Sequence, residues 1–221
     1  MRPAYYPAML DLAGRNALLV GGGEVAAQKA GPLLDAGVRL RIVAPKLNAS
    51  LRARVDSGDA TWEPREVQPG DTAGMAVVVC ATDSRDVNRR VFVEASAASI
   101  PVNVVDDPEL CTFIVPATIR RGSLQLAIST GGRSPAFAKF VRQQLESAIG
   151  EEFAELADLA GRLRDRARQA GMSYTARDQL AGDALPRLLA LLRAGQTTEA
   201  EELVDELISG ARTSMANGTQ R

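Results

Sequence analysis

The sequence predicts an α/β protein in two parts, a parallel sheet flanked by helices followed by a mainly helical segment. Over the first half of the chain, short continuous apolar runs such as residues 17–20 and 75–81 alternate with helical patterns. Such runs are typical of strands buried on both faces of a parallel sheet. After Gly150 the apolar spacing is helical throughout. The two parts therefore differ in fold class.

The first strand ends in three glycines, and a helical pattern follows them directly. The glycines form the pattern Gly21-x-Gly23-x-x-Ala26, in which Gly21 makes the turn and Gly23 lets a pyrophosphate approach the backbone. The small side chain of Ala26 lets the helix pack close to the strand, and the N-terminal N–H groups of that helix face the phosphates. A glycine-rich turn that binds nothing is the alternative. The strand-to-helix context favours a dinucleotide site in a Rossmann-like fold.

The overall composition excludes several kinds of partner. The 221 residues carry a formal net charge of −1 and are 46% hydrophobic, so we expect a globular protein with no nucleic-acid partner. We also expect no membrane partner, because no apolar run approaches the ~20 residues that span a bilayer. No secretory signal pattern is present, which predicts a cytoplasmic protein. Cys80 and Cys111 lie in apolar, strand-like surroundings and are interpreted as reduced core residues.

The chain contains no histidine. This excludes Ser-His-Asp and Cys-His nucleophilic arrangements and histidine-ligated zinc. We predict no metal site, and carboxylates remain as the proton acceptors.

The remaining elements of the first part follow the order of a doubly wound sheet. We predict helices over residues 24–35, 48–57 and 86–98, and strands over residues 38–44, 60–66, 75–81 and 100–105. The first helix stops at Ala36-Gly37, where glycine accepts a left-handed cap. The second strand ends in Val43-Ala-Pro-Lys46 instead of the acidic residue that usually binds ribose hydroxyls. The residues alone therefore leave the choice between NAD and NADP open.

Polar residues follow two later strands, at the edge where doubly wound sheets bind ligands. Thr82 and Asp83 follow one strand, and Asp106 and Asp107 follow the next. The two aspartates before Pro108 suit an Asx-type turn, which spacing alone favours. They also suit a carboxylate that accepts a proton while a nicotinamide accepts a hydride.

The pattern changes after Pro108. Residues 113–119 and 123–129 are predicted to form a β-hairpin around a turn at residues 120–122. Ser134 is a natural N-cap and Pro135 a natural first residue for a helix over residues 136–149. The apolar face of this hairpin and helix needs a partner, and a second subunit is the simplest candidate.

Four further helices are predicted over residues 151–170, 174–181, 184–194 and 199–208. A capping box, Thr198-x-x-Glu201, begins the last one. Four arginines on the first of these helices suit a solvated face, with contact to an anionic ligand as the alternative; they are Arg162, Arg164, Arg166 and Arg168.

An ordered set of motifs resembles one known family. The motifs are Leu19-Val-Gly-Gly-Gly-x-Val25, Val43-Ala-Pro45, Cys80-Ala-Thr-Asp83 with Val87-Asn88, Val102-Asn-Val-Val-Asp106, Phe113-Ile-Val-Pro-Ala117 and Ser129-Thr-Gly-Gly-x-Ser-Pro135. Over about residues 5–145 the chain is similar to precorrin-2 dehydrogenase / sirohydrochlorin ferrochelatase, the N-terminal module of siroheme synthase. The helical tail resembles the family only in length and character.

The resemblance implies NAD-dependent oxidation of precorrin-2 to sirohydrochlorin in siroheme or cobalamin synthesis, by a homodimer. Some members of the family also insert Fe²⁺ into sirohydrochlorin, and the residues do not resolve this lyase activity. The family's essential aspartate falls on Asp106, which overturns the turn interpretation. Its cofactor contacts fall on Gly21, Gly23, Glu24, Val25, Pro45, Lys46, Thr82 and Asp83, with Asn103 nearby.

The tetrapyrrole substrate carries many carboxylates and requires local cations. We hypothesise that arginines supply some of them through bidentate pairing, and Thr130 occupies a loop position that is sometimes serine in the family. The predicted substrate-binding residues are Arg120, Arg121, Thr130, Arg133 and Arg142. A non-catalytic Rossmann module that senses NAD(H) is the alternative function.

The predicted domains follow from these elements. They are an NAD-binding Rossmann domain over residues 1–115, a dimerisation region over 116–149, a helical C-terminal domain over 150–212 and a disordered tail over 213–221.

Overall fold

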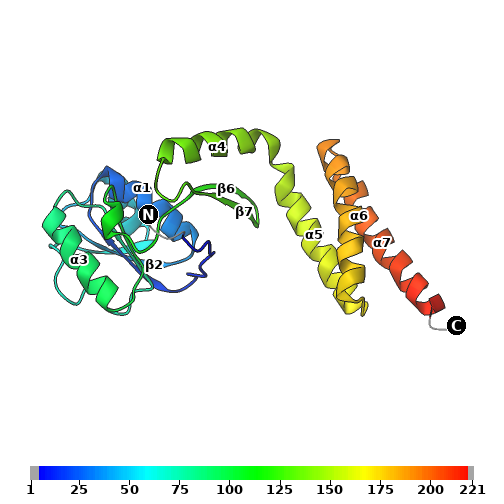
Figure 1. Cartoon of the computed structure of the whole chain (residues 1–221), viewed down its shortest axis with the longest axis horizontal. Coiled ribbons are helices and arrows are strands. Elements are labelled where there is room, and N and C mark those ends of the chain that lie inside the picture. The colour runs from blue at the N-terminus through cyan, green and yellow to red at the C-terminus, as the bar shows by residue number, and fades with distance from the viewer. Residues whose placement is uncertain (1–4, 219–221) are drawn as a thin grey trace. The chain divides into compact units, whose positions relative to one another are not determined.

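A computed structural model describes residues 5–218 of the chain, with side chains described up to Gly210 (Figure 1). The chain divides into two compact units, and the division lies between Val115 and Pro116. Within the described part of the chain, no helix is both long enough and apolar enough to cross a bilayer.

The first unit is built on a five-stranded parallel sheet of order β3-β2-β1-β4-β5. Its strands are β1 (Asn16–Val20), β2 (Arg39–Val43), β3 (Ala60–Glu63), β4 (Val77–Cys80) and β5 (Val102–Val104). The chain leaves β1 toward β2 and β3 and then returns to the other side of β1 with β4. A doubly wound sheet binds ligands beside this reversal, outside the carboxyl ends of the strands.

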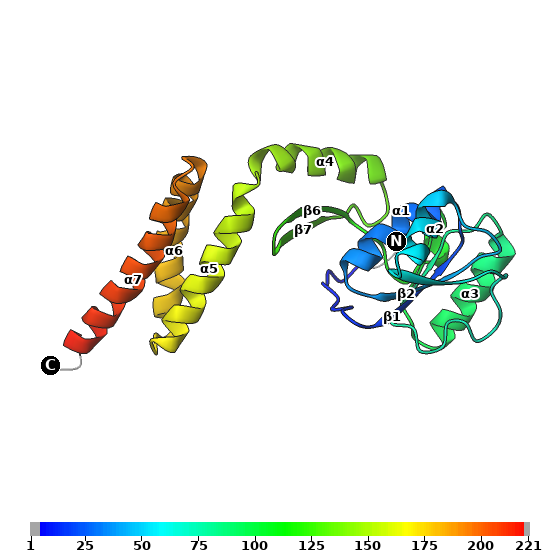
Figure 2. The ribbon, with the colours of Figure 1, turned by 180° about the vertical axis from the view of Figure 1, so that it is seen from behind.

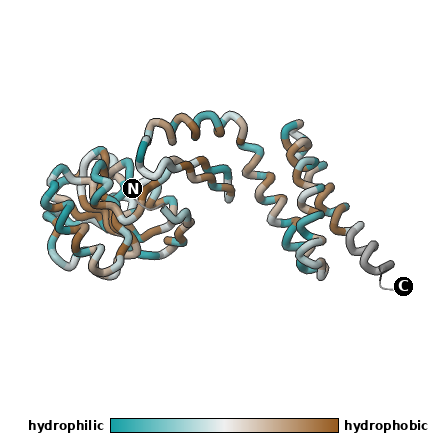
Figure 3. Tube along the Cα trace, in the orientation of Figure 1, coloured by the Kyte–Doolittle hydropathy of each residue, from teal (hydrophilic) through white to brown (hydrophobic). Residues whose placement is uncertain are grey.

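The alternation of side chains along β1 divides the core of this unit into two layers. Ala17 and Leu19 pack with α1 (Glu24–Asp35) and α2 (Ala49–Asp56) on one face. Leu18 and Val20 pack with α3 (Arg85–Ala97) on the other face. All four side chains are buried, and Figure 3 shows these central strands as hydrophobic. The continuous apolar run at residues 17–20 therefore reflects burial on both faces, as predicted.

Local sequence signals set the helix ends. Asn48 and Ser84 cap α2 and α3, accepting hydrogen bonds from Leu51 N (2.9 Å) and Val87 N (3.4 Å). Gly37 follows α1 with φ of 75°, a conformation that glycine adopts without steric cost. The predicted helices and strands of this unit are confirmed, and most strands are shorter than predicted.

The second unit begins with an antiparallel hairpin, β6 (Ala117–Arg121) and β7 (Leu124–Ile128), and α4 (Pro135–Ala148). The predicted turn at residues 120–122 is wrong, because Arg120 and Arg121 are paired strand residues and the turn is Gly122-Ser123. Gly122 has φ of 54°, which suits the first position of a two-residue hairpin turn. Ser134 caps α4 by accepting a hydrogen bond from Phe137 N (3.2 Å), as predicted.

Three helices complete the second unit, namely α5 (Glu152–Gln169), α6 (Tyr174–Arg193) and α7 (Thr197–Gly218). They lie side by side in Figures 1 and 2 and share an apolar core. Helix α6 replaces the two helices predicted over residues 174–194. Pro186 is exposed in this helix, while buried Ala184 and Leu188 continue the packed face.

The end of the chain differs from the prediction in two ways. The capping box is wrong, because α7 begins at Thr197 and the Glu201 carboxylate accepts a hydrogen bond from Arg162 Nη2 (2.9 Å). Of the predicted disordered tail, residues 213–218 belong to α7, and the remainder lies outside the described residues. No proline interrupts the chain after Pro186, so nothing in this stretch removes a backbone donor.

Candidate active site

A cavity of about 630 Å³ lies in the first unit at the carboxyl ends of β1, β2 and β4. Four segments line it: the glycine turn, the end of β2, the end of β4 and the loop after β3. Eight of the nine predicted cofactor-binding residues line this cavity; they are Gly21, Gly23, Glu24, Val25, Pro45, Lys46, Thr82 and Asp83. The topology therefore brings together residues that are up to 62 positions apart, between Gly21 and Asp83.

The three glycines of the turn have different physical roles. A Cβ on Gly21 would lie 2.3 Å from the carbonyl oxygen of Ala81, and a Cβ on Gly22 would lie 1.8 Å from that of Lys46. These two positions are glycine because the protein's own backbone fills the space. A Cβ on Gly23 would meet no atom within 4 Å, so the space above Gly23 is open to a ligand.

The start of α1 is suited to binding an anion. Gly23 is its N-cap residue and provides no side-chain hydrogen bond to the first turn. The first N–H groups of the helix therefore remain available to a ligand at its positive dipole end. The open space at Gly23 and these donors fit a dinucleotide pyrophosphate held by the turn.

Sequence reasoning missed Asn48, which connects two walls of the cavity. Its backbone N–H donates to the carbonyl of Gly22 (2.7 Å), and its side-chain Nδ2 donates to Glu24 Oε2 (3.1 Å). Its Oδ1 caps α2 at the same time. A helix-cap signal at Asn48 is visible in the sequence, but its contacts with the glycine turn depend on tertiary structure.

A buried asparagine shapes the wall at the end of β4. Asn88 Nδ2 donates to the carbonyl of Thr82 (3.0 Å), and the Thr82 hydroxyl lies 3.0 Å from Asn88 Oδ1. The Thr82 hydroxyl also accepts from Ser84 N (3.2 Å). These bonds fix the short segment that presents Thr82 and Asp83 to the cavity.

Asp106 follows β5 at the same edge of the sheet. The N–H of Val105 donates to the carbonyl of Cys80 at the end of β4 (2.9 Å), so the next residue, Asp106, leaves the sheet beside that strand. Asp106 is exposed and has φ of 60°. Left-handed backbone is uncommon outside glycine, and aspartate tolerates it better than most residues. Asp106 is not among the residues that line the cavity.

Asn103 and Asp107 have other partners. Asn103 does not line the cavity, because its Nδ2 donates to the carbonyl of Phe113 (3.0 Å). Its side chain points to the segment that follows the sheet, which no motif indicated. Asp107 Oδ2 lies 3.8 Å from Arg85 Nε, whose side chain is exposed, and such a long ion pair contributes little to stability.

The predicted substrate-binding residues all belong to the second unit, and three of them have structural partners. Arg121 Nε donates to the carbonyl of Ile149 (3.1 Å) and lies 3.3 Å from Glu151. Arg142 pairs with Glu146 one turn further along α4. The Thr130 hydroxyl accepts from Ser134 N (2.9 Å) and donates to the Ser134 carbonyl (3.1 Å), closing the loop before α4. Arg120 and Arg133 are exposed, with no ion pair among the described residues.

Two family models match the chain in succession. Residues 8–117 match a family described as putative NAD(P)-binding, and residues 121–148 match one described as sirohaem biosynthesis protein central. The chain is 41% identical over 219 residues to the siroheme synthase of Pseudomonas paraeruginosa, an alignment that covers 97% of this chain and 46% of that protein. The chain belongs to the family of the siroheme synthase N-terminal module. The siroheme synthase of Photorhabdus laumondii is also 41% identical, over 203 residues.

A solved structure supports this family membership. The structure entitled SirC, precorrin-2 dehydrogenase, aligns with a TM-score of 0.74 and 26% identity, covering 91% of this chain and all of that one. The chain spans about half the length of the curated siroheme synthases it matches. The predicted α/β fold and family are therefore confirmed, and the match across both units includes the helical segment.

Proposed function

We propose that this chain oxidises precorrin-2 to sirohydrochlorin with NAD as the hydride acceptor. The observation that carries the proposal is the glycine-lined cavity at the reversal point of the sheet, with Asp106 on the adjacent strand end. The name of the solved relative, precorrin-2 dehydrogenase, supports the same reaction. The siroheme synthases among the relatives support a place in siroheme synthesis.

Different residues bind the cofactor and accept the proton in this reaction. The N–H groups at the start of α1 bind the pyrophosphate, and Thr82 and Asp83 form the wall on the side of β4. Bound NAD supplies an electrophilic ring carbon that accepts a hydride, with two electrons, from the substrate. Asp106 accepts the proton that the substrate loses together with this hydride, or orients the macrocycle for this transfer. Two hydrogens thus leave the substrate, one as hydride and one as a proton.

The charges around the cavity favour NAD over NADP. Three carboxylates line it, from Glu24, Glu66 and Asp83, against one ammonium group from Lys46. The 2′-phosphate of NADP would add negative charge close to these carboxylates, which is unfavourable. We expect tighter binding of NAD than of NADP, and direct titration of both cofactors measures the difference.

An anaerobic assay with precorrin-2 and NAD tests the reaction. We expect NADH absorbance to appear together with the sirohydrochlorin spectrum. Asp106→Asn should keep the left-handed turn and NAD affinity, and should lower turnover by about 10²–10⁴-fold because the proton acceptor is lost. Full turnover by this variant would refute the role of Asp106. NAD binding without turnover by the wild type would favour an NAD(H) sensor.

For the tetrapyrrole carboxylates, exposed Arg120 and Arg133 are stronger candidates than Arg121 and Arg142, whose guanidinium groups already have partners. Arg133→Glu should raise the KM for precorrin-2 and leave NAD affinity unchanged, because it reverses one local cation. An unchanged KM would contradict this assignment. Thr130 acts by closing the loop that carries Arg133.

We also propose a homodimer formed through the hairpin and α4. Among the described residues of α4 only Ala138 is buried, while Phe137 and Phe140 are 56% and 55% exposed with their rings stacked at 6.4 Å. Large exposed aromatic side chains of this kind mark association surfaces. Light scattering should give twice the chain mass, and Phe137→Glu with Phe140→Glu should give the mass of one chain.

Iron insertion is tested by adding Fe²⁺ to sirohydrochlorin with and without the protein. In this reaction Fe²⁺ is a substrate, and Asp106 is the candidate acceptor of the pyrrole protons. Acceleration of siroheme formation by the protein would establish the second activity.

We propose that the reaction takes place in the cytoplasm. Cys80 is a free, buried cysteine, and burial raises the pKa of its thiol to about 12, which keeps it protonated. A free cysteine supports a reducing compartment. Fractionation of cells, followed by immunoblotting, tests this location.

A further inference from the structure

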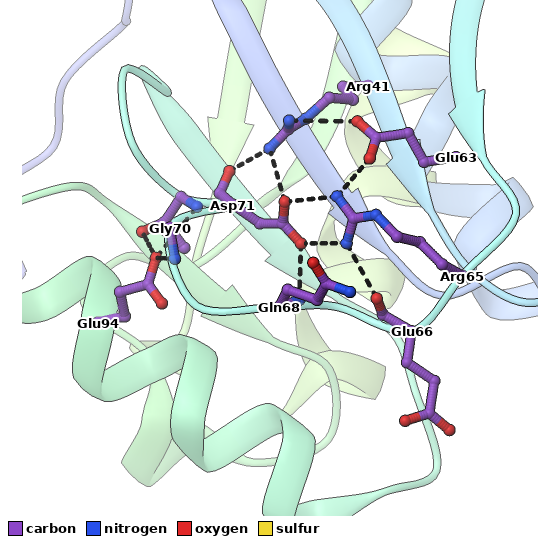
Figure 4. Close-up of polar contacts among 9 residues, drawn as sticks. Arg41, Glu63, Arg65, Glu66, Gln68, Gly70, Asp71 and Glu94 are labelled. Carbon is purple, nitrogen blue, oxygen red and sulfur yellow. Dashed lines mark hydrogen bonds and ion pairs between the residues drawn. The ribbon is translucent and has the colours of Figure 1, made fainter.

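The loop between β3 and β4 contributes one wall of the cavity. Glu66 and Val67, three and four residues after β3 ends, line it. No regular secondary structure covers the residues from Pro64 to Gln68, so other interactions must hold this wall. Figure 4 shows a network of polar contacts that includes Glu66 and Gln68 of this segment.

Arg65 and Asp71 form the centre of this network. Arg65 Nη1 and Nη2 donate to Asp71 Oδ2 and Oδ1, both at 2.8 Å, in a bidentate pair. Arg65 Nη1 also donates to the backbone carbonyl of Glu66 (2.9 Å), and Asp71 Oδ2 accepts from the backbone N–H of Gln68 (2.8 Å). The pair therefore holds the backbone on both sides of Val67, at two points.

Further contacts make the pair rigid. Arg65 also bonds Glu63, and Arg41 on β2 contacts both Glu63 (3.3 Å) and Asp71 (3.5 Å). Glu94 of α3 accepts a hydrogen bond from the backbone N–H of Gly70 (3.1 Å), the residue before Asp71. Asp71 is only 7% exposed. A carboxylate so deeply buried remains charged only while its partner is present.

The hydrogen bonds of this pair indicate what it is for. An ion pair with a buried carboxylate is seldom needed for stability, because apolar residues of similar size often stabilise a fold equally well. Here Arg65 and Asp71 form hydrogen bonds with the backbone of the segment that lines the cavity. In Figure 4 the carbonyl of Glu66 faces Arg65, while its side chain extends away from the network.

We infer that Arg65 and Asp71 are positioning residues for the cofactor site, holding Glu66 and Val67 against the adenosine half of NAD. The inference rests on the proposed function. The strand order shows which half of NAD lies at this wall. Glu66 and Val67 follow β3 at one edge of the sheet, and Asp106 follows β5 at the other edge. With the pyrophosphate at the central glycine turn, the nicotinamide lies toward Asp106 and the adenosine toward Val67.

Binding of cofactor fragments to full-length variants tests this inference. Asp71→Asn removes the charge, and Arg65→Lys keeps the charge but loses the bidentate fork. We expect each variant to weaken NAD and ADP by the same factor, about 10-fold, and to leave the weak binding of nicotinamide mononucleotide unchanged. In steady state, the KM for NAD should rise while kcat at saturating NAD and the KM for precorrin-2 stay the same.

Asp59→Asn is the matched control. Asp59 pairs with Arg54 at 3.2 Å in the same unit, but both side chains are exposed and neither lines the cavity. The NAD affinity of the Asp59→Asn variant should stay within 2-fold of the wild-type affinity. Hydrogen exchange of the peptide containing Gln68 should speed up in Asp71→Asn and not in Asp59→Asn, because only Asp71 accepts from that amide.

The outcomes separate this inference from the proposed function. A wild-type protein that binds no NAD overturns both. If the wild type binds NAD and a folded Asp71→Asn binds it with the same affinity, the positioning role alone is overturned. The positioning role is also overturned if the variant binds nicotinamide mononucleotide and NAD more weakly by the same factor. If Asp71→Asn does not fold, Arg65→Lys decides by the same measurements, since it retains the charge opposite Asp71.

Discussion

The two units differ in where their polar groups lie. Among the described residues, the buried polar or charged side chains are Asp71, Thr72 and Asn88, all in the first unit. The helical bundle of the second unit has a purely apolar core, with ion pairs such as Arg162–Glu201 about half exposed at its surface. Buried polar groups cost free energy. Asp71 and Asn88 both bond the backbone of segments that line the cavity, so buried polarity marks the unit that carries the candidate site.

The largest effect should come from the glycine turn. Gly22→Ala places a Cβ 1.8 Å from the Lys46 carbonyl oxygen, and we expect it to destabilise the first unit by about 3 kcal/mol and abolish NAD binding. Gly23→Ala meets no atom within 4 Å, so it should fold normally and lose NAD affinity alone. Trp62, the single tryptophan, lies in this unit, and its fluorescence during urea unfolding measures the difference. Equal stability of the two variants would contradict the different roles of these glycines.

A core substitution in the bundle should destabilise the second unit and leave NAD binding intact. Leu188 is fully buried among the apolar side chains of α5, α6 and α7, and Leu188→Ala should cost about 3 kcal/mol of bundle stability through cavity formation. Far-UV circular dichroism should show the helices unfolding at lower urea. Trp62 fluorescence and NAD affinity should not change. A shift in both probes would show that the units unfold together.

Acid should weaken the first unit through Asp71. The hydrogen bonds from Arg65 hold the pKa of Asp71 below its ordinary value of 3.8, so the unfolded state binds this proton more readily than the folded state. The resulting stability is complete well above pH 4 and is lost as pH falls through the lowered folded value. Trp62 fluorescence should follow this loss, and Asp71→Asn should flatten the pH dependence. An unchanged slope in that variant would assign the acid sensitivity to other carboxylates.

The smallest effect should come from the surface of the bundle. Glu201→Gln removes an ion pair whose side chains are about half exposed, and we expect a loss of about 0.5 kcal/mol or less. High salt should remove the difference between the variant and the wild type. Urea unfolding followed by circular dichroism at two salt concentrations measures it. A loss above about 2 kcal/mol would place this pair with the buried network of the first unit instead.

Local patterns predicted the elements of the first unit and the start of α4 well. The apolar run before Gly21, the cap at Ser134-Pro135 and the stop at Gly37 each depend on residues next to one another in the chain. The prediction failed where local signals competed with packing. The predicted break at residues 182–183 is wrong, because buried Ala184 and Leu188 belong to one packed face of a continuous helix α6.

The sequence by itself determined the fold class and the glycine turn, because these depend on short-range spacing and on backbone conformations that few residues adopt. The resemblance to a known family supplied the other predicted cofactor-binding residues. Only the tertiary structure decided which groups support that turn. Gly22 must be glycine because Lys46, 24 residues later, fills the space beside it. Arg65 and Asp71 resemble ordinary loop charges until β2, β3 and α3 bring their partners around them. Such contacts join residues far apart in the chain, and no local pattern encodes them.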